Sequence, residues 1–286
     1  MLCNLCPNNC NIDRSLKKGY CGETDKVRIA KYYLHPFEEP VISGKNGSGT
    51  IFFCGCSLKC VFCQNYELSR SLRGTEISIT RLAEIFRELE LAGAHNVSLV
   101  TATHYIPQII EAFKIYKPKI PVVYNTHAYE NLSALELIDP YIDVYLPDLK
   151  FFSPKASMRY TKKADYFDVA SKAVKFMMER KKTVVDGDGI MKSGVIVRHL
   201  ILPLNKQDSK NIVEWFLKNR ENGAYFSLMS QYVPYGDLSL TPELKRKITK
   251  KEYEDVLNVI LSSDFEDCFI QDEDSANLSF VPKWDM

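Results

Sequence analysis

The stretch IFFCGCSLKCVFCQN spans residues 51–65 and places a short β-rich run directly before three closely spaced cysteines. These cysteines, Cys56, Cys60 and Cys63, follow the order C-x3-C-x2-C. Iron–sulfur clusters are held by cysteine thiolates at short spacings of this kind, usually by four of them. With only three, one iron lacks a protein ligand and can take another. The stretch therefore predicts a cluster whose open iron the rest of the chain presents to a cofactor and a substrate.

A second cysteine set lies at the start of the chain. Cys3, Cys6, Cys10 and Cys21 are spaced C-x2-C-x3-C-x10-C, with prolines, asparagines and glycines between them. The total of nine cysteines is odd, and the first residues do not form a secretory leader. Clustered thiols in this setting favour metal ligation in a reducing compartment over disulfides. We expect a closed four-thiolate site that holds zinc or a second iron–sulfur cluster; the alternative is a thiol-rich tail without a metal.

The composition of the 286-residue chain is that of an ordinary globular protein, with 45% apolar and 26% charged residues. The net charge of +1 argues against bulk nucleic-acid binding, and the lysine-rich stretch 245–251 is best explained as a solvated face. No apolar run approaches the ~20 residues of a membrane span. We therefore expect a cytoplasmic protein without membrane attachment. The remaining cysteines, Cys54 and Cys268, are expected to be buried thiols, not ligands.

From residue 50 onward, apolar strand-like runs alternate with amphipathic helical patterns. The expected strands cover 50–54, 97–101, 121–125, 142–146, 195–201 and 225–229. Thr80, Asp208 and the capping box from Thr249 to Glu252 are expected to open helices between or after them. This alternation predicts an α/β fold with a parallel sheet. Six units, fewer than the eight of a full barrel, favour a partial (β/α)6 TIM-like barrel, with a doubly wound sheet as the alternative.

Three segments follow from this pattern. Residues 1–45 form a small cysteine-rich metal-binding module with its connector, 46–262 form the partial barrel, and 263–286 form a C-terminal extension. In either parallel-sheet architecture, ligands bind at the carboxyl ends of the strands. Polar residues at those ends are therefore the candidate binding residues.

The C-x3-C-x2-C spacing after a strand, with Phe62 just before the last cysteine, resembles the signature of the radical SAM superfamily. Within it, the chain resembles the activating enzymes of glycyl radical enzymes, such as the pyruvate formate-lyase activating enzyme. It looks most like a group of activating-enzyme-like proteins with an extra N-terminal cysteine cluster. The segments that carry this likeness are LCPNNC, SGTIFFCGCSLKCVFCQNYE, VTATHY, YNTHAYE, DVYLPDLK, VRHLILP and SLMSQYVP.

The resemblance implies a [4Fe–4S] cluster on the three cysteines, with S-adenosylmethionine (SAM) chelating the fourth iron through its amino and carboxylate groups. Reductive cleavage of SAM would give a 5′-deoxyadenosyl radical that abstracts hydrogen from a protein glycine or another substrate. Such an enzyme works anaerobically and needs a reductant such as flavodoxin or ferredoxin. Its partner would be a glycyl radical enzyme or a peptide.

The resemblance also assigns SAM contacts. Phe62 would lie beside the adenine, Asn125 would face the ribose, and the D-x-K of Asp148 and Lys150 would contact the methionyl and ribose region. Gln231, at the end of the sixth strand, would stand against the adenine.

Two further pairs of residues, Arg198 with His199 and Thr101 with Thr103, lie in or just after expected strands. Arg198 and His199 are adjacent in a strand and so point to opposite faces; we expect Arg198 to face the interior, as the family's basic residue does. Thr101 and Thr103 stand where the family carries a glycine-rich loop, and their oxygens could accept hydrogen bonds from the SAM ammonium group. His104 and His127 also lie at strand ends, where structural and active-site roles are equally open.

Other interpretations of these residues and of the chain remain. Asp148 could be a helix N-cap and Lys150 a solvated turn residue. The substrate could be a small molecule, a nucleoside or a peptide instead of a protein glycine. From another class, the chain could be a non-enzymatic iron–sulfur or zinc-binding module, such as an electron carrier or a nucleic-acid adaptor.

Overall fold

The structure is a computed structural model that describes residues 2–71 and 73–271. Its strands are β1 (Arg28–His35), β2 (Ser48–Phe53), β3 (Thr75–Glu76), β4 (Val97–Val100), β5 (Val122–Thr126), β6 (Val144–Pro147), β7 (Val184–Val185), β8 (Met191–Leu200), β9 (Tyr225–Met229) and β10 (Cys268–Ile270). Its α-helices are α1 (Pro40–Ser43), α2 (Tyr66–Ser69), α3 (Ile79–Leu91), α4 (Ile106–Ile115), α5 (Leu132–Ile138), α6 (Pro154–Thr161), α7 (Tyr166–Arg180), α8 (Lys206–Asn219) and α9 (Lys250–Leu261). Short 3₁₀ turns lie at Thr103–Tyr105, Asp139–Tyr141 and Pro242–Leu244.

The strands form one sheet in the order β10-β9-β8-β6-β5-β4-β2-β1-β3, with β7 paired to β8. From β2 to β10 each strand pairs in parallel with the next one along this path, so the sheet follows chain order in a single direction. A doubly wound sheet would reverse that order at a switch point. The fold is therefore the expected α/β partial TIM-like barrel, built from six strand–helix units.

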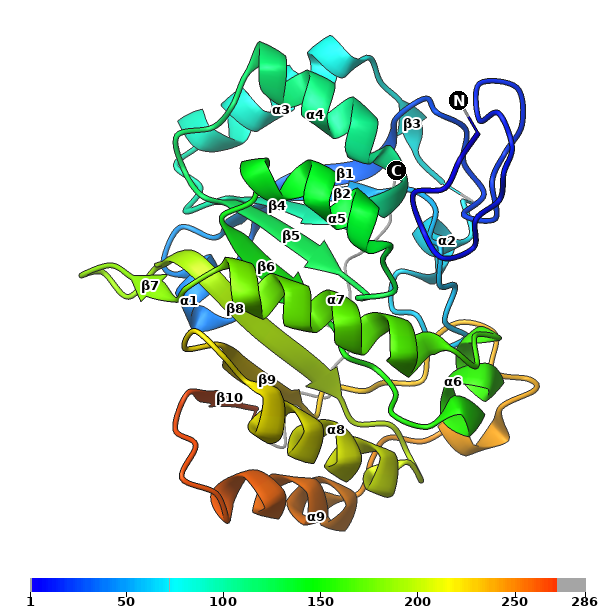
Figure 1. Cartoon of the computed structure of the whole chain (residues 1–286), viewed down its shortest axis with the longest axis vertical. Coiled ribbons are helices and arrows are strands. Elements are labelled where there is room, and N and C mark those ends of the chain that lie inside the picture. The colour runs from blue at the N-terminus through cyan, green and yellow to red at the C-terminus, as the bar shows by residue number, and fades with distance from the viewer. Residues whose placement is uncertain (1, 72, 272–286) are drawn as a thin grey trace.

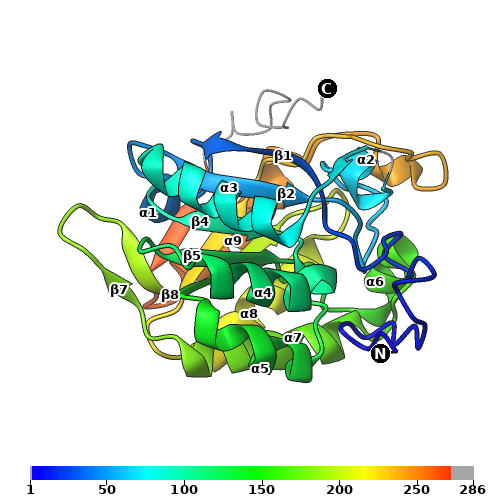
Figure 2. The same cartoon turned by 90° about the horizontal axis from the view of Figure 1, so that it is seen from above.

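Helices α3, α4, α5, α7, α8 and α9 lie in a row along one face of this curved sheet (Figure 1, and from above in Figure 2). The central parallel strands are buried, since the helices cover one face of the sheet. In β2, β4 and β5 all residues are buried. Such near-continuous burial is what apolar, β-branched runs in a parallel sheet predict.

Local sequence signals predicted one helix cap correctly and two incorrectly. Thr249 and Glu252 form the predicted capping box at the start of α9. Two expected caps are wrong. Ser78, not Thr80, caps α3 by accepting from the Arg81 N–H. Asp208 lies inside the first turn of α8 and instead accepts from the backbone N–H groups of residues 152 and 153, at 2.9 and 2.7 Å.

The segment before the barrel is more regular than the sequence suggested. Residues Arg28–His35 form β1, which pairs antiparallel with β2 and extends the sheet edge. Residues 2–24 carry no helix or long strand, and Figure 1 shows them beside α2, at the edge toward which the parallel strands point. Of the expected extension 263–286, residues 272–286 lie outside the described part of the chain. No helix in residues 2–71 or 73–271 is long and apolar enough to cross a membrane.

Candidate active site

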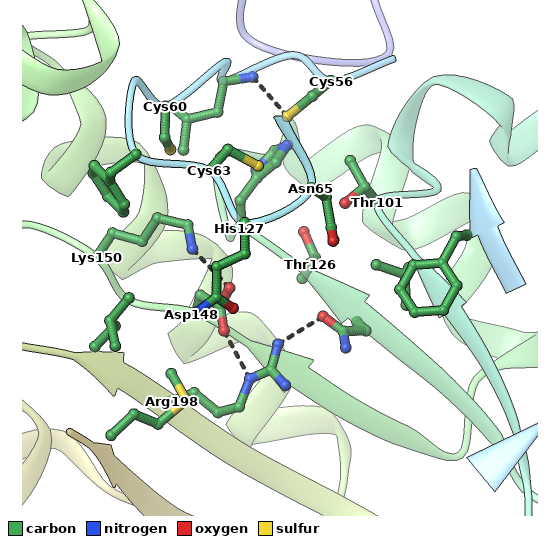
Figure 3. A pocket seen from close by; sticks show the side chains of 18 of the residues that line it. Cys56, Cys60, Cys63, Asn65, Thr101, Thr126, His127, Asp148, Lys150 and Arg198 are labelled. Atoms are coloured by element: carbon green, nitrogen blue, oxygen red, sulfur yellow. Dashed lines mark hydrogen bonds and ion pairs between the residues drawn. The ribbon is translucent and has the colours of Figure 1, made fainter. Parts of the chain in front are cut away.

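The cysteine loop begins where β2 ends, and it turns over the carboxyl edge of the sheet. Gly55 has a φ of 83°, and a Cβ there would lie 2.6 Å from the Glu23 side chain and 2.9 Å from the Cys21 carbonyl oxygen. Only glycine permits this close approach. The sharp turn brings Cys56, Cys60 and Cys63 onto the wall of one cavity of about 210 Å³ (Figure 3).

The environment of these thiols suits metal-bound thiolates. The Leu58 N–H points at Cys56 Sγ at 3.4 Å, and N–H groups aimed at sulfur stabilise iron–sulfur clusters. Burial raises the pKa of all three thiols, so a bound metal is what would deprotonate them here. Within residues 2–71 and 73–271, no three Cys, His, Asp or Glu side chains are arranged to hold a single metal ion. A four-iron cluster spreads its ligands more widely than one ion does.

Opposite the loop, a row of alternating charges lines the cavity. Lys150 Nζ lies 2.7 Å from Asp148 Oδ2, and Arg198 Nε lies 2.7 Å from Asp148 Oδ1. Arg198 Nη1 lies 2.8 Å from Glu38 Oε2, and Arg198 Nη2 donates to Asn125 Oδ1 at 2.7 Å. Figure 3 shows Lys150, Asp148 and Arg198 side by side beneath the cysteines.

The charge states of this row follow from burial and pairing. Burial raises the pKa of Asp148, but the Arg198 and Lys150 charges outweigh it and the net shift is downward. Burial lowers the pKa of Lys150, and the Asp148 carboxylate reverses this, giving a net upward shift. Burial raises the pKa of Glu38 against the opposing Arg198 charge. Because both Glu38 oxygens accept hydrogen bonds, we describe it as a carboxylate.

A neutral histidine supports the loop from below. His127 Nδ1 accepts from the Tyr129 N–H at 3.1 Å, so its proton is on Nε2, which donates to Ser57 Oγ at 2.9 Å. Burial, followed by the nearby Lys150 charge, lowers the pKa of His127 to about 3. The bond ties the residue next to Cys56 to the end of β5. His127 thus lines the cavity and also fixes the loop.

The structure places the sequence-predicted SAM contacts as follows. Seven line the cavity: Phe62, Thr101, Asn125, Asp148, Lys150, Arg198 and Gln231. Arg198 faces the cavity, whereas His199, on the other face of β8, bonds the Leu149 carbonyl at 2.7 Å. The expectation for Thr103 is wrong, because its hydroxyl is buried and donates to Glu130 Oε1 at 2.7 Å. Asp148 and Lys150 pair with each other and are neither cap nor solvated turn.

Thr101 takes over a conformation that usually needs glycine. It has a φ of 59°, in the left-handed region where a β-branched residue is strained. Its N–H donates to the Asn125 carbonyl at 2.9 Å, which holds it at the end of β4. Here a threonine adopts a glycine-like backbone at the cavity wall.

Sequence reasoning missed several residues of the cavity. Glu38 belongs to the segment HPFEEP (residues 35–40), which begins at the end of β1. Two adjacent glutamates next to a phenylalanine and between two prolines were the sequence feature that could have indicated a binding residue here. His35 and Phe37 accompany it on the wall. Glu130 lies behind the cavity, where hydroxyls of Thr103 and Thr126 donate to it. Burial raises the pKa of Glu130 to about 7, with the hydroxyls opposing.

The N-terminal cysteines lie beside the loop and do not line the cavity within the described residues. A Cβ at Gly19 would lie 3.3 Å from Cys21 Sγ and 3.8 Å from Cys10 Sγ, so these two thiols both lie against Gly19. Hydrogen bonds fasten this set to the loop: the Cys56 N–H donates to the Cys21 carbonyl at 3.2 Å, and Asn8 Nδ2 donates to the Ser57 carbonyl at 2.8 Å. The two cysteine sets therefore share one backbone contact.

His104 and Cys54 have structural roles. His104 Nε2 donates to the Cys54 carbonyl at 2.7 Å, and burial lowers the pKa of His104 to about 3. Cys54 is fully buried, as expected, and its thiol donates to the Arg73 carbonyl at 3.0 Å. Cys268 is half-buried in β10.

Comparison with known proteins agrees with this site. Residues 50–216, more than half of the chain, match the family model of the Radical SAM superfamily. The uncharacterized protein MJ0674 of Methanocaldococcus jannaschii is 29% identical over 267 residues, covering 90% of this chain and 73% of that protein.

Solved structures share the fold. SuiB of Streptococcus suis, and the same protein bound to S-adenosylmethionine, superpose with TM-scores of 0.51 and 0.50 at 16% identity. The alignments cover 78% and 75% of this chain, which spans about half (47%) of the length of each SuiB chain. At this identity the likeness concerns the fold alone.

Proposed function

The chain belongs to the radical SAM superfamily, and from that premise we propose that it is an activating enzyme that abstracts hydrogen from a glycine of a protein or peptide. Membership in the superfamily implies a [4Fe–4S] cluster and SAM. We assign the cluster to Cys56, Cys60 and Cys63. We assign the SAM site to the cavity that these three cysteines share with the charged row.

One observation carries the assignment: three thiols and the Lys150–Asp148–Arg198 row face each other across one cavity at the carboxyl ends of the parallel strands. When bound and reduced, the cluster would supply the electron for cleaving SAM to methionine and a 5′-deoxyadenosyl radical. The chain supplies orientation and shelter from water. Asp148 keeps lone pairs for ribose hydroxyls after accepting from both cations, and Lys150 offers N–H donors to a carboxylate.

The remaining predicted contacts fit a nucleoside. Phe62 is 5% exposed and lies edge-on to Phe151, Tyr160 and Tyr232, which fixes its ring at the cavity wall. Gln231, at the end of β9, lines the same cavity. An aromatic ring and an amide are the groups that stack on and hydrogen-bond to an adenine.

The charges of the cavity favour an uncharged substrate group. Among the described residues, the four Asp, Glu, Lys and Arg side chains that line it, Glu38, Asp148, Lys150 and Arg198, form ion pairs with one another. They are therefore satisfied without a charged substrate, and the glycine backbone of a peptide requires no counter-charge. The alternative is a radical SAM enzyme for a small molecule, a nucleoside or another peptide residue.

We also propose that Cys3, Cys6, Cys10 and Cys21 hold a second metal centre, either zinc or an iron–sulfur cluster. The Tyr20 N–H and the Asn8 amide, which point at Cys10 Sγ and Cys6 Sγ at 3.3 and 3.5 Å, support this. Because no three Cys, His, Asp or Glu side chains of the described residues are arranged to hold one metal ion, the arrangement favours a cluster, whose ligands are spaced more widely, over zinc. Metal analysis of a Cys3→Ala/Cys6→Ala variant, with zinc and iron counted separately, distinguishes the two metals.

The reductant is proposed to be a small acidic electron carrier, such as flavodoxin or ferredoxin. Lys59, within the cysteine loop, and Lys163 lie over the Tyr20 ring, with Nζ atoms 5.0 and 4.2 Å from its centroid. These cations lie near both cysteine sets and would attract an acidic partner.

The glycine proposal is tested by isotope transfer. A protein encoded beside this chain, carrying a candidate glycine loop, is prepared with α-deuterated glycine and mixed with reconstituted enzyme, SAM and reductant without oxygen. Deuterium in 5′-deoxyadenosine supports the proposal. SAM cleavage with deuterium only from another labelled residue or from a small molecule would favour the alternative.

A further inference from the structure

Glu38 forms an ion pair and hydrogen bonds with other cavity residues, although it lies outside the part of the chain that matches the family model. It precedes residues 50–216, yet its Oε2 lies 2.8 Å from Arg198 Nη1 and its Oε1 accepts from Asn125 Nδ2 at 3.2 Å. The side chains of Glu38 and Arg198 are only 10% and 11% exposed. We infer that Glu38 is a positioning residue that fixes Arg198 and Asn125 for SAM binding.

The contacts show how Glu38 acts. Arg198 donates from three nitrogens to three different elements: Nε to Asp148, Nη1 to Glu38 and Nη2 to Asn125. The guanidinium is therefore held between two carboxylates and cannot turn without breaking an ion pair. A planar guanidinium that is held at three nitrogens also fixes the positions of the side chains it contacts.

Glu38 also fixes the orientation of the Asn125 amide. Asn125 Oδ1 accepts from Arg198, and Asn125 Nδ2 donates to Glu38, so a flipped amide would place a donor against a donor and an acceptor against an acceptor. The second amide hydrogen and the second oxygen lone pair remain for a ligand. Removing Glu38 leaves Arg198 alone to orient the amide, which weakens any hydrogen bond that Asn125 makes in the cavity.

The backbone around Glu38 is built to hold it. The Glu38 N–H donates to Ser43 Oγ at 2.9 Å, and that hydroxyl donates to the His35 carbonyl at 3.1 Å. Helix α1 is in turn anchored by the Asn96 amide, which donates to the Ile42 carbonyl at 2.7 Å. The connector between β1 and β2 is thus a fixed part of the cavity.

Loss of the Glu38 charge should act through Arg198. In Glu38→Gln, Arg198 keeps a single carboxylate, and it then competes more strongly with Lys150 for Asp148. A hydrogen bond to a charged group contributes about 1.5–3 kcal/mol, which corresponds to roughly 10- to 100-fold in affinity. We expect SAM affinity to fall by about tenfold or more in this variant, and Glu38→Asp to retain most of it.

The inference rests on the SAM site proposed above, and the experiment separates the two. SAM dissociation constants are measured by anaerobic calorimetry on the reconstituted full chain for wild type, Glu38→Gln, Glu38→Asp, Arg198→Met and the Glu38→Gln/Arg198→Met double variant. Glu221→Gln, at an exposed position, serves as the matched control. Iron content and thermal unfolding are recorded for each.

If Glu38 acts through Arg198, the double variant binds SAM no more weakly than Arg198→Met alone, since coupled residues are non-additive. Wild-type affinity in Glu38→Gln, additive losses, or an equal loss in Glu38→Asp would overturn the inference while the SAM site stands. Wild-type protein that binds no SAM overturns the proposed function itself.

Discussion

The two cysteine sets of this chain are adjacent in space but differ in their surroundings. Cys56, Cys60 and Cys63 lie on a loop anchored to the parallel sheet and open onto a cavity with a charged wall. The four N-terminal cysteines lie on a segment without regular elements and are kept from the cavity by the loop to which they are bonded. A site that binds and transforms a ligand keeps an open position, whereas a structural or relay site is closed by protein thiolates.

The comparison explains the role of the barrel. In the proposed site, strands β5, β6, β8 and β9 end opposite the three cysteines and supply polar side chains to the cavity. The N-terminal set has no such strands and depends on contacts with the loop for its place. We expect variants of the two sets to fail in different ways.

The largest difference concerns single cysteines. Cys60→Ala should abolish 5′-deoxyadenosine formation and remove the iron of this cluster, because a cluster with two protein thiolates is not held. The Cys3→Ala/Cys6→Ala variant should lose the metal of the N-terminal site and keep a cluster that binds SAM. Iron content, visible absorption and product formation check both. Full SAM cleavage in Cys60→Ala would invalidate the assignment.

The second-largest effect is expected for variants of the charged row of Lys150, Asp148 and Arg198. Asp148→Asn removes the carboxylate that holds Arg198 and Lys150, and breaking charge-assisted bonds should weaken SAM binding by roughly 10- to 100-fold. Calorimetry on the reconstituted protein measures this, with the exposed Asp188→Asn as control. Unaltered affinity in Asp148→Asn would place SAM elsewhere.

Docking of the N-terminal segment should affect stability more than chemistry. Arg14 is 5% exposed and donates to the carbonyl oxygens of His104 and Thr24. Arg14→Met leaves one buried and one partly buried carbonyl acceptor without this donor and should lower the free energy of unfolding by about 2 kcal/mol. Chemical denaturation measures the change, and Lys17→Met, at an exposed position, is the control. A stability equal to wild type would mean that the segment is not fastened here.

The last effect is one of pH dependence and concerns a residue between the two regions, Glu130. Its folded pKa is about 7, raised by burial above the ordinary 4.5. The unfolded chain therefore binds fewer protons than the folded chain between these values, and stability falls as pH rises through them. Glu130→Gln removes that loss, which is about 1.4 kcal/mol per pH unit. The variant should gain stability relative to wild type from pH 5 to pH 7. A constant difference across this range would argue against a raised pKa.

Much of the fold and part of the site follow from local sequence. The six parallel strands and the cysteine loop were predictable because continuous apolar runs and close cysteine spacing are local signals. The D-x-K residues were found because they directly follow a strand. The C-terminal strand β10 was not predicted, since three residues of moderate burial carry no pattern.

What the sequence did not reveal depends on contacts between distant residues. Glu38 meets Arg198 across 160 positions, and Thr103 turns away from the cavity because Glu130, 27 positions later, accepts its hydroxyl. Asp208 looked like a helix cap but satisfies backbone groups 55 and 56 positions earlier. Local propensity cannot decide among such partners, because only the folded sheet brings them together.

Our central claim is that SAM binds the cluster iron that receives no cysteine ligand from the loop. The most direct test is electron–nuclear double resonance on the reduced, reconstituted protein with SAM carrying ¹⁵N at its amino group. We predict a hyperfine coupling between that nitrogen and the cluster in wild type, which is lost in Cys60→Ala together with the cluster. A reduced cluster that forms normally but shows no coupling to bound, labelled SAM would contradict it.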